Sequence, residues 1–135
     1  MRIENYDYCY SIVTSMLPRK DNVVVKKADA YTDRILKMTK YLKEIKHEHI
    51  ISVQILRSGT SIGANIAESR NAQGPKDFVN KLNIALKEAD ETEYWLGKLK
   101  SGGYLTEKEY QSMFVDNEEI IKLLTSIIKT MKERM

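Results

Sequence analysis

One of the two histidines follows a glutamate at a spacing that metal-binding helical bundles use. The segment 44–47 has the pattern Glu-x-x-His, and His49 lies two residues beyond it. A di-iron bundle needs a second such motif and two further glutamates that point inward. The residue three positions before His49 is Lys46, so the second motif is missing. We therefore expect His47 and His49 to be solvated residues at a helix end, with no metal and no other cofactor.

An acidic stretch and a lone cysteine are the other side chains that could take part in catalysis or metal binding. Glu88, Asp90, Glu91 and Glu93 lie close together in the chain and would suit a metal ion or a general acid. The interpretation that we favour is a solvated or subunit-contacting helix face. Cys9 is the single cysteine, so it forms no disulfide within the chain, and no base accompanies it for nucleophilic catalysis. We predict no catalytic residue.

Basic residues near the middle of the chain are the candidates for binding phosphates. Our predicted nucleic-acid-binding set is Arg57, Arg70, Lys76, Lys81 and Lys87, and a second group near the end of the chain is Lys122, Lys129, Lys132 and Arg134. Lysine and arginine neutralise backbone phosphates. The alternative is that these residues are ordinary surface charges with no ligand. The chain carries 22 Lys and Arg against 19 Asp and Glu, a net charge of +3. This balance permits a nucleic-acid partner without requiring one.

A glycine-containing stretch, residues 58–64, could be taken for a phosphate-binding loop. A P-loop has the pattern G-x-x-x-x-G-K-[ST] after a strand. Here Gly59 and Gly63 have a different spacing and no lysine follows them. Glycine inside a helix costs about 1 kcal/mol relative to alanine. We therefore expect these two glycines to allow another helix to approach closely.

The elements that position these residues are expected to be long helices in one domain. The 135 residues include only 6 Gly and 2 Pro, fewer turn formers than an all-β protein needs. Apolar residues at steps of three and four predict helices over about 25–46, 49–69 and 75–100. A fourth begins with a capping box, Thr106 and Glu109. Short connections between such helices predict an all-α, antiparallel, up-down-up-down four-helix bundle over residues 23–135.

The predicted core comprises one face of each helix. The third helix has the clearest face, formed by Phe78, Leu82, Ala85, Ala89, Thr92, Leu96 and Leu99. The first helix is expected to bury Tyr31, Ile35, Met38, Leu42 and Ile45, and the fourth Tyr110, Phe114, Ile121, Leu124, Ile128 and Met131. A second set of apolar residues lies off these faces: Ile50, Val53, Leu56, Ile84, Leu86, Tyr94 and Trp95. A lone bundle buries one stripe per helix, so the second set suggests a partner.

Residues 1–22 show no helical period and are expected to form a tail, either disordered or docked. Two other interpretations stay open: Met16 is the true start, or the segment anchors a neighbouring subunit. No apolar run is long enough to span a membrane. The single cysteine and the absence of a signal-like start favour a cytoplasmic protein.

A segment of the second helix resembles a family signature. Its residues are Ser61, Ile62, Ala64, Asn65, Ile66, Ala67 and Glu68, and Leu82–Leu86 and Gly103–Leu105 add to the likeness. Over residues 26–132 the chain resembles the bacterial four-helix bundle proteins encoded in intervening sequences of large-subunit ribosomal RNA genes. These ribosomal-protein-like proteins are similar to the accessory variability determinant of diversity-generating retroelements. Ser69 replaces a frequent glycine, and Gly63 a frequent proline.

The resemblance implies a four-helix protomer and a ring-like homopentamer. The signature residues within 61–68 are expected to have a structural role. In the retroelement relatives a basic surface is thought to bind nucleic acid and a reverse transcriptase. The resemblance brings no enzymatic activity with it. We therefore expect a non-enzymatic homo-oligomer, a pentamer, that contacts RNA or DNA electrostatically. The alternative is a protein-interaction adaptor or scaffold without nucleic-acid affinity.

Overall fold

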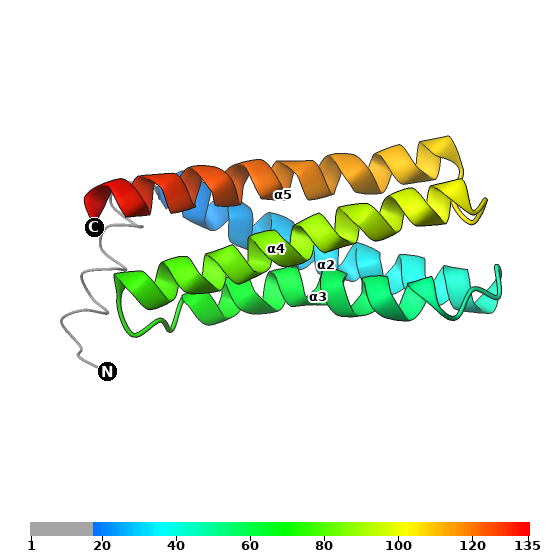
Figure 1. Cartoon of the computed structure of the whole chain (residues 1–135), viewed down its shortest axis with the longest axis horizontal. Coiled ribbons are helices and arrows are strands. Elements are labelled where there is room, and N and C mark those ends of the chain that lie inside the picture. Colours follow the sequence, from blue (N-terminus) through cyan, green and yellow to red (C-terminus); the bar gives the residue numbers. More distant parts are fainter. Residues whose placement is uncertain (1–17) are drawn as a thin grey trace.

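The computed structural model describes residues 18–135, with side-chain surroundings from residue 23 onward, and this part of the chain is all helical. The helices are α2 (Pro18–Glu44), α3 (Ile51–Ser69), α4 (Pro75–Ser101) and α5 (Glu107–Arg134). In Figure 1 the chain reverses direction at each connection, so successive helices are antiparallel. The predicted fold class, an up-down-up-down bundle, is confirmed.

The N-terminal end of the first helix lies earlier than its periodicity suggested. Helix α2 begins at Pro18, so residues 18–22 of the predicted tail are helical. Proline is tolerated in the first turn of a helix because no intrahelical partner is available there for its missing N–H group. Residues 1–17, which include Cys9 and Met16, lie outside the described residues, and so do the expectations about the rest of the tail.

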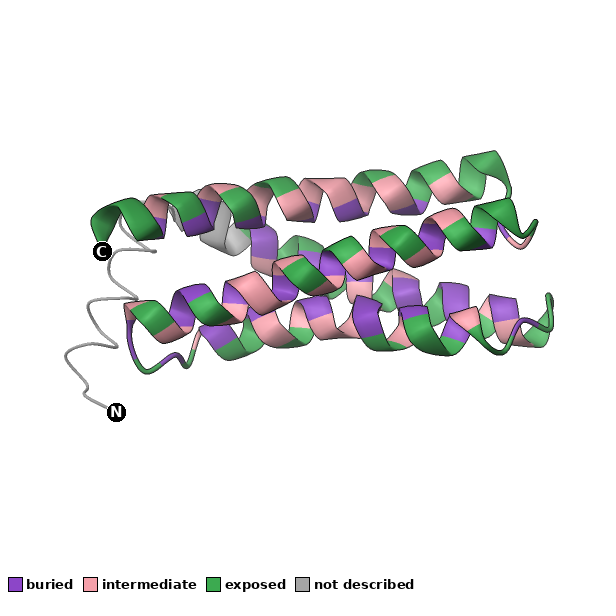
Figure 2. Ribbon diagram, viewed as in Figure 1, coloured by how far each residue is buried: buried purple, intermediate pink, exposed green. Residues whose placement is uncertain are grey.

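Each helix packs against two neighbours around a shared core. Helix α2 lies against α3 and α5, and α4 lies against the same two helices from the opposite side. Figure 2 shows the buried residues turned toward the centre of the bundle and the exposed ones turned outward. All seven predicted core residues of the third helix are buried, as are the α2 residues Tyr31, Ile35, Met38 and Leu42. Helical period alone therefore located most of the core.

The predicted inner face was wrong at two places. Ile45 is 63% exposed because α2 ends at Glu44 and the chain then turns through His47, which has a φ of 55°. In the first half of α5, Met113, Asn117 and Ile120 are buried. The predicted residues there, Tyr110, Phe114 and Ile121, are only half-buried, and Tyr110 and Ile121 pack against the edge of the core.

A buried asparagine explains the shifted face of α5. Asn117 has no exposed surface, and its side-chain Nδ2 donates a hydrogen bond of 2.9 Å to the backbone oxygen of Ala89 in α4. A polar residue at a core position interrupts the apolar pattern from which the face was inferred. The aromatic residues Tyr110 and Phe114, which precede Asn117 in the helix, therefore looked like the better core candidates.

Two glycines in α3 let α2 approach closely, as the sequence predicted. A Cβ atom on Gly59 would lie 2.8 Å from Cδ1 of Ile35, which is fully buried. A Cβ atom on Gly63 would lie 2.6 Å from Oγ1 of Thr32 and 3.4 Å from the backbone oxygen of Ala28. The separations of 2.8 Å from Ile35 and 2.6 Å from Thr32 are closer than a real Cβ atom tolerates. The close packing of α2 against α3 therefore requires glycine, which has no side chain, at both positions.

The connection from α2 to α3 is closed by Glu48, which is almost fully buried. Its Oε2 accepts hydrogen bonds from the backbone N–H groups of Ile51, at 2.9 Å, and Ile50, at 3.2 Å, and Oε1 accepts from Ser52 at 2.7 Å. The carboxylate thus caps three N–H groups that have no intrahelical partner. Burial raises the pKa of Glu48, but these hydrogen bonds outweigh it and hold the pKa below its ordinary value.

Substituting Gly59 by alanine should destabilise the bundle, because the new methyl group meets the enclosed Ile35. We expect G59A to lower the free energy of unfolding by about 1–2 kcal/mol in a urea titration. Gly97 of α4 is the matched control, since a Cβ atom there meets nothing within 4 Å. Alanine at that position should raise the free energy of unfolding by about 0.5–1 kcal/mol. Equal effects at the two positions would contradict the close approach.

Substituting Glu48 by glutamine should reduce the dependence of stability on pH. The pKa of Glu48 is lowered in the folded state, so its stabilisation is present above the unfolded pKa and is lost as the pH falls through the folded pKa. We expect E48Q to cost about 1 kcal/mol at neutral pH. The difference from the unmodified protein should shrink toward pH 3, as followed by urea unfolding over a pH series. A constant difference would show that the charge makes no contribution.

Candidate nucleic-acid interface

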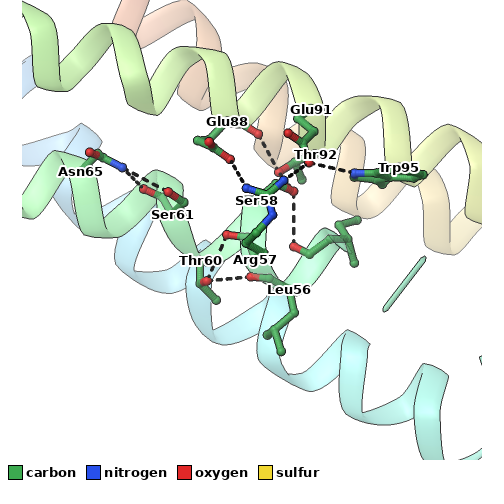
Figure 3. Close-up of polar contacts among 11 residues, drawn as sticks. Leu56, Arg57, Ser58, Thr60, Ser61, Asn65, Glu88, Glu91, Thr92 and Trp95 are labelled. Carbon is green, nitrogen blue, oxygen red and sulfur yellow. Dashed lines mark hydrogen bonds and ion pairs between the residues drawn. The ribbon is translucent and has the colours of Figure 1, made fainter. Parts of the chain in front are cut away.

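Arg57, the first of the five predicted phosphate-binding residues, is held by two carboxylates of the neighbouring helix. Figure 3 shows it reaching from α3 toward Glu88 and Glu91 of α4. Its Nη1 lies 3.4 Å from a carboxylate oxygen of Glu88, and its Nη2 pairs with Glu91. Glu91 also accepts a hydrogen bond of 3.1 Å from Nε1 of Trp95. The guanidinium is therefore part of the α3–α4 contact and is poorly placed to meet a phosphate.

A buried hydroxyl pair lies beneath this ion pair. Oγ1 of Thr92 and Oγ of Ser58 are 2.9 Å apart, and neither residue has exposed surface (Figure 3). The Thr92 hydroxyl also has the backbone oxygen of Glu88 within 2.8 Å as an acceptor. Polar groups in a core are tolerated when they are hydrogen-bonded. The two hydroxyls thus align α3 with α4 at the same level as Arg57.

The other four predicted residues do not form one cluster with Arg57. Lys81 of α4 lies 3.5 Å from a carboxylate oxygen of Glu68, and Arg70 is half-buried at the end of α3 and is not free of partners. Lys76 and Lys87 are exposed, and among residues 23–135 no ion pair involves either. They are separated by about 16 Å along α4, at 1.5 Å per residue. Two of the five predicted residues therefore remain available to a ligand.

The acidic stretch of α4 divides between two faces of the helix. Glu88 and Glu91 turn toward Arg57, whereas Glu93 lies near Glu118 of α5. Burial raises the pKa of Glu93, and the negative charges of Glu118 and Asp90 raise it further. Like charges that are close enough to disfavour ionisation also repel phosphates. This part of the α4–α5 face is therefore unsuited to a nucleic acid.

The seven signature residues mix core and surface positions. Ile62 and Ile66 are buried in the core, and Nδ2 of Asn65 donates to the backbone oxygen of Ser61 at 2.9 Å. The remaining three, Ala64, Ala67 and Glu68, are exposed. The two alanines line a furrow of about 450 Å³ between α2 and α3. The isoleucines therefore contribute to the core, Asn65 bonds within its own helix, and the exposed alanines border the furrow.

A groove that sequence analysis did not identify lies between α2 and α5. It has a volume of about 550 Å³, and its lining residues are Arg34, Lys37, Met38, Tyr41, Leu105, Lys108, Glu109, Ser112 and Met113. The residues at its edge on α2 recur at helical spacing, next to the core stripe. That spacing was the signal in the sequence that could have indicated the α2 side of the groove, but it could not show that the start of α5 lies opposite. Arg34, Lys37 and Lys108 therefore line one groove although no sequence motif connects them.

The second set of apolar residues is exposed in part, as a partner surface requires. Ile50 is 76% exposed, and Val53 and Tyr94 are about half exposed. The other four, Leu56, Ile84, Leu86 and Trp95, are half-buried. Within residues 18–135 no helix is long and apolar enough to cross a lipid bilayer.

Comparison with known proteins covers most of the bundle. A family model described as 23S rRNA-intervening sequence protein matches residues 20–126. The chain is similar to a solved structure, a protein of unknown function from the S23 ribosomal protein family of Bacteroides thetaiotaomicron VPI-5482, with 55% sequence identity and a TM-score of 0.81. That match covers 82% of this chain and 98% of the other. No curated protein matches the chain.

Substituting Arg57 by glutamine should affect stability more than the same change at Lys87. Arg57 bridges two helices, whereas Lys87 is exposed and makes no ion pair among residues 23–135. Because Arg57 is itself half exposed, we expect R57Q to lower the free energy of unfolding by only about 0.5–1 kcal/mol. The loss should diminish at high salt, and K87Q should change stability by less than about 0.5 kcal/mol. Indistinguishable urea transitions would show that the pairing has no structural role.

Proposed function

Because the chain belongs to the 23S rRNA-intervening sequence protein family, we propose that it is a non-enzymatic homo-oligomer that binds RNA or DNA through exposed lysines. The oligomer that we propose is the pentamer implied by the family resemblance. Binding is to the phosphate backbone, with little recognition of base sequence. Contacts of this kind position a protein on nucleic acid without reading sequence.

The observation that carries this proposal is the number of exposed lysines left without a carboxylate partner. On α4 and α5 these include Lys76, Lys87, Lys122, Lys129 and Lys132, none of which forms an ion pair within residues 23–135. Lys129 and Lys132 flank a groove of about 510 Å³ between the two helices, with Asn83 and Leu86 opposite. Ammonium groups on flexible stems bind phosphates as point charges. They supply affinity but no pattern of donors and acceptors for a base.

Exposed apolar residues support the oligomeric part of the proposal. Ile50, Val53 and Tyr94 would face water in a single protomer, at the end of the bundle where α3 begins. Contiguous apolar surface on a soluble protein often marks an interaction site. A closed ring buries such a surface against a different surface of the next copy. A pentamer would therefore remove these side chains from water.

A protein-interaction adaptor without nucleic-acid affinity is the second candidate. It is favoured by the α3–α4 face, where Arg57 and the carboxylates of Glu88 and Glu91 neutralise one another. A face with this balance repels neither acidic nor basic partners, and the neighbouring apolar residues could bind a protein. Recovery of a protein partner that survives nuclease treatment, together with no affinity for RNA or DNA, would favour it.

Light scattering should find a mass near five protomers. Addition of a mixture of RNA and DNA at low salt should raise that mass, and moderate salt should reverse the increase. Three phosphate contacts would weaken binding by about 40-fold between 50 and 200 mM salt, because each contact releases counterions. A mass of one protomer would contradict the ring, and an unchanged mass with nucleic acid at low salt would contradict the binding proposal.

A further inference from the structure

The seam between α2 and α5 is bridged by the ion pairs Lys27–Glu119 and Arg34–Asp116, and it also contains a groove. Its groove lies where α2 ends and α5 begins, at the end of the bundle away from the C-terminus (Figure 1). A volume of about 550 Å³ is within the range of small-ligand sites, roughly 300–1,000 Å³. The groove is therefore large enough to take a planar group the size of a nucleobase.

The floor of the groove is apolar and adaptable. Met38, Leu105 and Met113 line it and are themselves more than nine-tenths buried. Methionine side chains are flexible and polarisable, and their sulfur atoms make favourable contacts with aromatic rings. Tyr41 adds an aromatic ring to the wall from α2. An apolar floor beside an aromatic wall suits the face of a flat, aromatic ligand.

The rim of the groove carries cations, of which two are uncommitted. Arg34 pairs with Asp116 and donates a hydrogen bond of 2.7 Å to Oγ of Ser112. Glu109 is engaged as well, since its Oε1 accepts from the backbone N–H of Thr106 at 2.8 Å in the capping box that begins α5.

Lys37 and Lys108 remain, one on each side of the groove. Both are exposed, and among residues 23–135 neither forms an ion pair. Helix α2 contributes the first and the start of α5 contributes the second. An anion that enters between them meets two ammonium groups that are not ion-paired, while the nearby Glu109 carboxylate accepts the Thr106 N–H. The groove therefore combines a recess for an apolar group with two sites for negative charge.

We propose that this groove binds one nucleotide of single-stranded RNA or DNA. The base enters the recess against Tyr41 and the methionines, and the flanking phosphates bind Lys37 and Lys108. Bases of a duplex are already stacked and paired, so only a single strand can place a base in the recess. A phosphodiester is negatively charged at neutral pH and is joined to its base through the sugar. One nucleotide therefore brings a flat base and a negative charge close together, which matches a groove with an apolar floor and a charged rim. This inference rests on the proposed nucleic-acid binding and names its site.

The test is fluorescence anisotropy with a labelled, mixed-sequence single-stranded RNA of about ten nucleotides, compared with a duplex of the same sequence. The double variant K37A/K108A should weaken single-strand binding by about tenfold or more. The matched control K26A/K40A also removes two exposed lysines of α2, neither of which forms an ion pair among residues 23–135, and should weaken it by less than about threefold. The variant Y41L should weaken single-strand binding by about fivefold or more, with little effect on the duplex, because it removes the stacking surface.

The other possible outcomes distinguish a failure of the groove as the site from a failure of nucleic-acid binding as a whole. If the two double variants weaken binding equally, the groove is not the site, although binding by surface lysines stands. If the unmodified protein binds neither RNA nor its duplex at low salt, the proposed function fails and the groove inference fails with it. If a glutamate-rich peptide binds and K37A/K108A abolishes that binding while RNA does not bind, the groove serves a protein partner instead. Circular dichroism and urea unfolding of Y41L verify that a loss of binding is not a loss of fold.

Discussion

The close approach of α2 to α3 across Gly59 and Gly63 is the constraint on which the rest of the bundle depends. With a hydrogen atom in place of each side chain, Ile35 and Thr32 of α2 lie directly against the backbone of α3. On its other side, α2 is joined to α5 by long side chains, in the pairs Lys27–Glu119 and Arg34–Asp116. The groove lined by Lys37 and Lys108 lies along this second seam of α2.

Buried polar groups set how far each helix is displaced along its neighbour. Ser58 meets Thr92 between α3 and α4, Asn117 reaches the backbone of Ala89 between α4 and α5, and the hydroxyl of Tyr31 donates to the backbone oxygen of Met113 between α2 and α5. An apolar core alone would allow several alignments of similar energy, because apolar contacts have no direction. A shift by one turn would leave these groups buried without partners, at roughly 1–3 kcal/mol each. Oδ1 of Asn117 already lacks a partner among the described residues.

The surface charges divide into those that join helices and those that remain for a ligand. Arg57 and Lys81 belong to the first class through carboxylates on the adjacent helix, as does Lys100 through Glu107, 2.8 Å away. These pairs contribute little stability because they are exposed to water. They nevertheless neutralise cations that would otherwise attract phosphates. The uncommitted lysines on α4 and α5, such as Lys76, Lys87 and Lys129, belong to the basic groups that the sequence singled out. Lys37 and Lys108, at the groove between α2 and α5, do not.

The sequence by itself determined the four helices, most of their buried faces, the capping box before α5 and the need for a close helix contact at the two glycines. Those features follow from local spacing, because residues three and four apart share one side of a helix whatever surrounds it. The same rule failed where Asn117 interrupted the apolar pattern and where the turn at His47 ended α2 before Ile45. Sequence also selected basic residues, but it could not tell Arg57, which a neighbouring helix neutralises, from Lys87, which is exposed. Only the tertiary structure decided that distinction and brought Lys37 beside Lys108, because both depend on contacts between segments far apart in the chain.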